Sequence, residues 1–288
     1  MKKLILLFLI LTFGSSLQAQ IPGEAEYLKS EEYLAARDYE NWYEQLKLAA
    51  AKSHPAATGR MGDAYYFGKP ETKLKQSFDE ALAWYKKAAE LKDKDATYLV
   101  GNMYRDGKIT GKTYTDAVEY YKTIVPKGNY DAAQLIAEAY ITGEGVTQNY
   151  ATAMEWLKKG EAVKHAGCIY DMGYMYRNGA GVTKDINKAM GYYETACSLG
   201  DKLACENLGE LYYQGTEITG SVELCRKWYE MGSNLGSSKS SFYLSVLYTA
   251  KVLEGGKIVA AAYAKLAREQ GLDDESYKWL AEKINAME

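Results

Sequence analysis

The chain has 288 residues, of which 47% are hydrophobic and 25% are charged, and its formal net charge at pH 7 is -3. This composition is that of a globular protein with enough apolar residues for a large core, so it excludes disordered, collagen-like and membrane-embedded classes. The small negative charge gives no electrostatic basis for binding nucleic acid, and we expect no nucleic-acid partner.

The first segment of the chain has the pattern of a secretory signal peptide. Lys2 and Lys3 form a basic start, and an apolar run follows from Leu4 to Phe13. Such a run rises about 15 Å as a helix, half of a bilayer's hydrocarbon thickness, so we expect no membrane span. No cysteine directly follows the predicted cleavage site, so we expect no lipid anchor there. The pattern predicts removal of residues 1–19 and a secreted or periplasmic mature protein, in a compartment that permits disulfides.

Two series of aromatic residues then recur along the chain at intervals of 35 to 39 residues, most often 36. A glycine stands three positions after each of the first five tyrosines of the first series. Because two independent series keep the same interval, they predict a repeat protein. The first series is Tyr65, Tyr104, Tyr140, Tyr176, Tyr212 and Tyr248, and the second is Trp84, Tyr120, Trp156, Tyr192, Trp228 and Tyr263.

Each repeat contains two segments of helical pattern. In the first, apolar or small residues recur on one helical face up to the tyrosine, as from Ala204 to Tyr212. A small residue such as Gly209 stands three before the tyrosine, which predicts close approach of a neighbouring helix, and the glycine three after it is expected to end the helix. A polar residue such as Asp185 opens the second helix. Helix pairs without strand signals must stack on one another as an α-solenoid.

Three stretches closely resemble the Sel1-like repeat, a relative of the tetratricopeptide repeat: Asn207 to Tyr212, Gly179 to Asp185, and Glu80 to Glu90. The resemblance covers residues 56–271. It implies an all-α, right-handed α-solenoid of about six helix-turn-helix repeats.

The ends of the repeat array depart from the pattern, as terminal units of solenoids commonly do. In the sixth repeat, Lys251 replaces the capping glycine and Ser245 stands at the small position. Residues 20–55 are expected to form N-terminal capping helices, and residues 272–288 a C-terminal capping helix.

The chain has four cysteines, and two of them flank a junction between repeats. Cys197 ends one second helix and Cys205 begins the next first helix. This spacing is similar to that of cysteine-rich secreted bacterial members of the family, so the resemblance implies a disulfide between them. Cys168 offers a competing partner for Cys197, and unpaired buried thiols are a further alternative. Cys225 is expected to be a free core thiol.

No enzymatic or cofactor motif fits the pattern. Gly107 to Thr113 ends like a phosphate-binding loop, but it is one residue too short between its glycines and follows a helix instead of a strand. His54 and His165 lie at no metal-ligand spacing, and we expect both to be exposed. We therefore predict no metal, no cofactor and no catalytic residues.

The first helices also carry three positions whose side chains vary between repeats: six and two before the tyrosine, and one after it. These offsets share a stripe opposite the tyrosine face. In tetratricopeptide-like solenoids the first helices line the concave surface, so the resemblance implies a groove, and its tyrosines and arginines favour a protein or peptide partner. The candidate binding residues are Tyr98, Asn102, Arg105, Gln134, Glu138, Tyr170, Tyr174, Arg177, Glu206, Glu210 and Tyr213.

The sequence thus favours a non-enzymatic secreted or periplasmic scaffold that binds a protein or peptide in this groove. The alternative is a β-lactamase-like or cell-wall amide hydrolase, because some secreted, cysteine-rich relatives have been described in such terms. The chain has no Ser-x-x-Lys motif, which would supply the usual nucleophile for that chemistry. A module for self-assembly is a third hypothesis.

Overall fold

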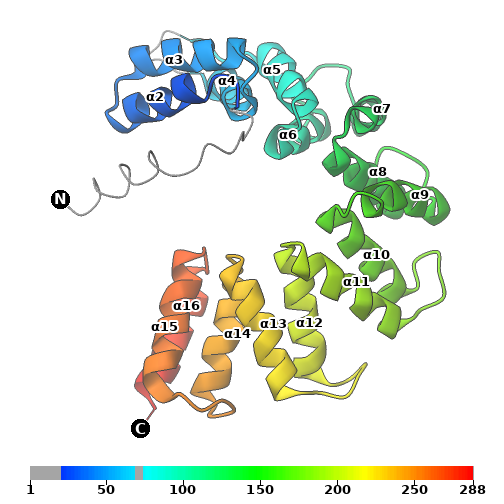
Figure 1. The fold of residues 1–288 in the computed structure, drawn as a ribbon, viewed down its shortest axis with the longest axis vertical. Coiled ribbons are helices and arrows are strands. Elements are labelled where there is room, and N and C mark those ends of the chain that lie inside the picture. The colour runs from blue at the N-terminus through cyan, green and yellow to red at the C-terminus, as the bar shows by residue number, and fades with distance from the viewer. Residues whose placement is uncertain (1–20, 69–73, 288) are drawn as a thin grey trace, which may run out of the picture. The chain divides into compact units, whose positions relative to one another are not determined.

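The computed structural model describes residues 21–68 and 74–287, so the predicted signal peptide lies outside the described residues (Figure 1). Within these residues the chain forms fifteen α-helices and no β-strand, which confirms the all-α prediction. The helices are α2 (Glu24–Ala35), α3 (Tyr39–Ala51), α4 (Pro55–Phe67), α5 (Phe78–Glu90), α6 (Lys94–Arg105), α7 (Tyr114–Ile124), α8 (Tyr130–Thr142), α9 (Tyr150–Glu161), α10 (Ala166–Asn178), α11 (Ile186–Ser198), α12 (Lys202–Gln214), α13 (Val222–Asn234), α14 (Ser238–Thr249), α15 (Gly256–Glu269) and α16 (Asp274–Asn285), with a short 3-10 helix η2 (Val125–Lys127).

The helices pack as consecutive pairs, as expected for helix-turn-helix repeats. The chain divides into two compact units, Met1–Met103 and Tyr104–Glu288. In the first unit α2 packs on α3 and α4 on α5, and in the second α8 packs on α9, α10 on α11, α12 on α13, and α14 on α15. The second helices α3, α9, α11 and α13 also contact the first helix of the next pair, for example α11 with α12, so these packed pairs share a continuous core. Among the described helices, none is long and apolar enough to cross a bilayer.

The residues predicted to bound the helices do so. Asp185 is the N-cap of α11, where its Oδ1 accepts a hydrogen bond of 3.0 Å from the amide of Lys188. Gly179 and Gly215 end α10 and α12 with φ of 70° and 63°, in the left-handed region that glycine enters without strain. In the sixth repeat, Lys251 adopts the same region with φ of 58°. The turn geometry therefore persists where the glycine is absent.

The small residue three before each tyrosine permits close packing between the two helices of a repeat. A Cβ added to Gly209 would lie 2.6 Å from the ring of Tyr229, a fully buried side chain of α13. Real Cβ atoms do not approach a ring this closely, so the position requires glycine. The same contact joins Gly62 to Tyr85 and Gly173 to Tyr193. The predicted close approach of a neighbouring helix is confirmed at these positions.

The two aromatic series meet inside the repeats. Tyr176 stacks on Tyr192 with ring centroids 5.5 Å apart, and Tyr248 stacks on Tyr263 at 5.7 Å. Each pair joins the first helix of a repeat to its second helix. The shared interval in the sequence therefore reflects a contact repeated in the fold.

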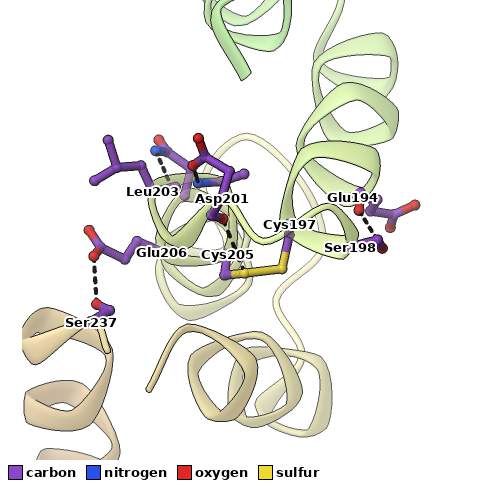
Figure 2. The surroundings of a disulfide bond; sticks show 10 residues. Glu194, Cys197, Ser198, Asp201, Leu203, Cys205, Glu206 and Ser237 are labelled. Carbon is purple, nitrogen blue, oxygen red and sulfur yellow. Dashed lines mark hydrogen bonds between the residues drawn. A yellow bond between two sulfur atoms is a disulfide. The ribbon is translucent and has the colours of Figure 1, made fainter. Parts of the chain in front are cut away.

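A disulfide joins Cys197 of α11 to Cys205 of α12, across the junction between two repeats (Figure 2). Cys168 and Cys225 are free and buried, and burial raises the pKa of the Cys225 thiol to about 11. The competing pairing of Cys168 with Cys197 is therefore not the one in the structure.

One repeat further along, serines replace the bonded cysteines. Ser233 and Ser241 stand 36 residues after Cys197 and Cys205, and their buried hydroxyl oxygens are 2.6 Å apart in a hydrogen bond. A polar contact thus occupies the place of the covalent link at this junction.

The prediction that both histidines are exposed is wrong. His54 is 4% exposed and is the N-cap of α4, where Nδ1 accepts a hydrogen bond from the amide of Ala57 and Nε2 lies 2.9 Å from Glu24. His165 is half-buried and caps α10, with Nε2 3.1 Å from Asp131. A histidine that directly precedes a helix can accept from the amide three residues on, and that role draws its ring into the junction between helices.

Candidate functional site

The first helices of the second unit lie on the inner side of its curve. α8 contacts α10 and α12 contacts α14, whereas the second helices α9, α11 and α13 approach one another less. Helices on the inner side of a curved stack are closer together than those on the outer side. The predicted binding residues from Arg105 to Tyr213 are carried by α6, α8, α10 and α12.

Two of these residues belong to a buried polar cluster between α8 and α10. Gln134 Nε2 donates a hydrogen bond of 3.3 Å to Glu138 Oε1. Asp171 is 7% exposed, and its Oδ2 has no hydrogen-bond partner among the described residues. Burial, and next the negative charge of Glu138, raise the pKa of Asp171 well above its usual range. Burial also raises the pKa of Glu138.

The Asp171 carboxyl is expected to make stability fall as pH rises. Its pKa is raised by folding, so its favourable contribution is complete below the unfolded pKa of about 4 and is lost as pH climbs through the folded value. Asp171→Asn keeps the size and shape of the side chain but does not ionise. Urea unfolding between pH 4 and pH 8 should therefore show a widening advantage of the variant over the wild type, by up to about 1.4 kcal/mol per pH unit. A difference that stays constant across this range would contradict the assignment.

A second network holds α10 and α12 together. Arg177 Nε donates to Glu217 Oε2 at 3.0 Å, and Nη1 donates to Asn207 Oδ1 at 2.9 Å. Asn207 Nδ2 in turn donates to the Tyr170 hydroxyl at 3.3 Å. Two predicted binding residues, Arg177 and Tyr170, thus help to fix consecutive repeats in register.

The carboxylates predicted on α12 bond the next repeat. Glu206 Oε1 accepts a hydrogen bond of 2.5 Å from Ser237, the N-cap of α14 (Figure 2). Glu210 pairs with Lys239 of α14 at 3.0 Å. Glu206 and Gln134 are 9% and 8% exposed, so they do not present side chains to a ligand as the stripe predicted. Both residues stand six positions before the tyrosine of their repeat. Side chains at this position face the first helix of the neighbouring repeat and are buried by the contact between repeats.

Other members of the stripe are accessible. Tyr174 and Tyr213 are 44% and 47% exposed. Arg105 is exposed, with its guanidinium 2.8 Å from Glu144 and above the ring of Tyr114. The inner stripe consists of five of these side chains on α10 and α12: Tyr170, Tyr174, Arg177, Glu210 and Tyr213. These five side chains combine aromatic and charged groups on a scaffold fixed by hydrogen bonds.

The remaining two predicted residues belong to the first unit. Tyr98 is half-buried and Asn102 is exposed, both on α6. The second unit begins at Tyr104, so neither residue belongs to the inner stripe.

Sequence reasoning missed Asp171 and Asn207, the polar centres of the two networks. Both stand five residues before the tyrosine of their repeat, where two preceding repeats have Leu99 and Leu135. A polar residue at a repeat position that elsewhere holds leucine indicates a buried polar contact, and this signal could have been found in the sequence.

The segment that resembles a phosphate loop is an ordinary connection between helices. Thr113 caps α7 and forms a capping box with Asp116. Lys112 pairs with the same carboxylate at 2.7 Å. Within the described residues, no group of three or more histidine, cysteine, aspartate or glutamate side chains could hold a metal ion.

The family follows from comparison with known repeats. The Sel1 repeat model matches five consecutive segments, residues 55–93, 94–123, 127–161, 166–201 and 202–237, which make up more than half of the chain. The chain belongs to the Sel1 repeat family. Proteins of this family are scaffolds for protein-protein interaction. A search of curated proteins finds no match.

Solved structures with a similar fold come from several bacteria. A Sel1 repeat protein from Oxalobacter formigenes is 25% identical, with a TM-score of 0.62 over 84% of this chain and 99% of that chain. A protective antigen of uropathogenic Escherichia coli with an SLR fold is 22% identical, with a TM-score of 0.55 over 92% of this chain and 62% of its own length. An immunity protein of Pseudomonas aeruginosa is 20% identical, with a TM-score of 0.51 over 76% of this chain and 82% of that chain.

Proposed function

We propose that this Sel1 repeat protein is a non-enzymatic scaffold that binds a protein or peptide on its inner stripe. The observation that carries the proposal is the exposure of Tyr174 and Tyr213 on α10 and α12, helices held in register by the Arg177 network. Aromatic and arginine side chains supply much of the binding energy at protein interfaces. Because the helices are already ordered, little conformational freedom is lost when a partner binds.

The proposed location is the periplasm or the exterior of the cell. The basic and apolar pattern of residues 1–19 supports it, and so does the disulfide between Cys197 and Cys205, a bond typical of oxidising compartments. Cell fractionation followed by mass determination of the N-terminus tests this location. Cytoplasmic protein that retains residues 1–19 would contradict it.

The hydrolase alternative is not favoured. The sequence has no Ser-x-x-Lys motif for acyl transfer. The carboxylates of the inner-side networks bond neighbouring repeats, as Glu206 does with Ser237 and Glu210 with Lys239. These contacts serve the architecture of the solenoid, since Ser237 is the N-cap of α14 and Lys239 lies in its first turn.

The inner stripe is tested by truncating its two exposed aromatic side chains. We expect Tyr174→Ala/Tyr213→Ala to weaken binding of every partner retained by the mature wild-type chain at least about tenfold, since aromatic hot spots contribute about 2 kcal/mol or more each. The measurement is a quantitative pull-down followed by titration of the purified partner. Circular dichroism and the melting temperature establish that the variant is folded.

The matched control removes two exposed aliphatic side chains at helix ends elsewhere in the unit, Leu203 in the first turn of α12 and Leu235 at the end of α13. Leu203 and Leu235 are 46% and 40% exposed, and Leu203→Ala/Leu235→Ala should leave the affinity unchanged. Full binding by the tyrosine variant would show that the inner stripe is not the interface.

A further inference from the structure

A second surface feature lies on α9, α10 and α11, apart from the inner stripe. It is a hollow of about 480 Å³. Ile169, Tyr192 and Leu199 give it apolar and aromatic walls, and Glu161, Lys164 and Glu194 contribute charged groups. Figure 2 shows Glu194 on the side of α11 that points away from the disulfide.

Gly191 keeps this hollow open, and the packing of the chain gives no reason for a glycine there. Gly191 is an exposed residue inside α11, and a Cβ built on it would meet no atom within 4 Å. Glycine is among the least favourable residues in a helix interior. The equivalent positions 36 residues before and after are Glu155 and Lys227. A long side chain of either kind would extend into the space that Gly191 leaves free.

The charged groups of the hollow have no partners of their own. Glu161, Glu194 and Lys164 form no ion pair within residues 21–68 and 74–287. Two carboxylates and one ammonium group line the hollow, so its formal charge is negative. An unpaired carboxylate beside apolar walls favours a ligand with an aliphatic stem and a cationic head.

We propose that this outer hollow is a second binding site of the protein, one that receives an arginine side chain from a protein partner. A guanidinium group bonds carboxylates through a planar set of donors and stacks on aromatic rings, here Glu161 or Glu194 and the ring of Tyr192. The methylene groups of arginine would lie against Ile169 and Leu199. The site is independent of the inner stripe and requires no rearrangement of the helices.

The test uses N-acetylarginine amide as the probe and the mature chain labelled at isoleucine and leucine methyl groups. We expect saturable NMR shifts at Ile169 and Leu199, with a dissociation constant of about 1 mM, the range of a single side chain. N-acetylcitrulline amide has the same shape without the charge and should bind at least about fivefold more weakly. The absence of saturable shifts at these methyl groups would overturn the proposal. It would also be overturned if N-acetylcitrulline amide, or the corresponding lysine compound, bound as tightly as N-acetylarginine amide.

Two variants connect the binding to the hollow. Gly191→Gln fills the space with a good helix former, so it should abolish the shifts while the melting temperature stays the same or rises. Glu194→Gln keeps the shape and removes one charge, and it should weaken the probe at least about threefold. If Gly191→Gln binds as the wild type does, the shifts arise elsewhere and the proposed site is wrong. Both variants leave the inner stripe intact, so loss at one site is distinguishable from loss at the other.

Discussion

Replacing Tyr229 with alanine should lower the free energy of unfolding by about 3 to 5 kcal/mol, the range for removing a buried aromatic ring. The ring is fully buried, packs against Gly209 and stacks on Tyr243 with centroids 5.3 Å apart. Removing the ring leaves a cavity between the two helices of the repeat, and a cavity adds to the cost of the lost contacts. Urea unfolding followed by circular dichroism measures the change.

Tyr229→Phe is the matched control for this prediction. The Tyr229 hydroxyl is buried and has no hydrogen-bond partner among the described residues. Removing an unsatisfied buried hydroxyl is close to neutral or stabilising. A large loss of stability in Tyr229→Phe, or a small one in Tyr229→Ala, would contradict the packing described here.

Breaking the disulfide should lower the free energy of unfolding by about 2.5 kcal/mol, because the bond restricts a short loop of the unfolded chain. Cys197→Ser/Cys205→Ser is the suitable variant, since Ser233 and Ser241 show that the next junction accommodates a hydrogen-bonded serine pair. The stability of the wild type with and without reductant, compared with that of the double variant, measures the effect.

The free cysteines provide the control for the disulfide prediction. Cys168 and Cys225 are buried and unpaired, so reductant should not change the stability of Cys197→Ser/Cys205→Ser. Alkylation of the unfolded wild type without reductant should label two cysteines. Labelling of four, or equal stability of the oxidised and reduced chains, would contradict the link between repeats.

The fold was predictable because its signals are local and repeated. The glycines that end α10 and α12 and the Asp185 cap each follow from backbone geometry that a single helix requires. The glycine at position 209 marks the close approach of a second helix. Recurrence of the same signals at a fixed interval then predicts stacked pairs of helices. The disulfide lies at the junction where this register places Cys197 beside Cys205.

The identity of the deepest core residues was harder to predict. The second aromatic series marks the repeat in the sequence. The fully buried rings, however, belong to tyrosines that stand one position after members of that series. Adjacent positions differ by about 100° around a helix, so two neighbouring aromatic residues compete for the face that meets the first helix. These buried tyrosines are Tyr85, Tyr121, Tyr193 and Tyr229.

The candidate site shows a similar limit. Offsets from the tyrosine placed Tyr174 and Tyr213 on the first helices, where they are exposed. The same offsets did not show that Gln134 and Glu206 are buried, because their burial depends on the distance between consecutive first helices. Helical periodicity predicts which side chains share a face of one helix. It does not predict hydrogen bonds between two helices, such as the one between Glu206 and Ser237.

Site-specific photo-cross-linking tests the central claim, recognition of a protein partner by the inner stripe, most directly. A photoreactive phenylalanine derivative is placed at Tyr174, and in a second variant at Glu155, an exposed residue of α9. After illumination in the native compartment, we predict that the variant at position 174 forms a discrete adduct with a partner protein and that the variant at position 155 does not. Adducts from position 155 alone, or no adduct from position 174 at wild-type abundance, would contradict the account.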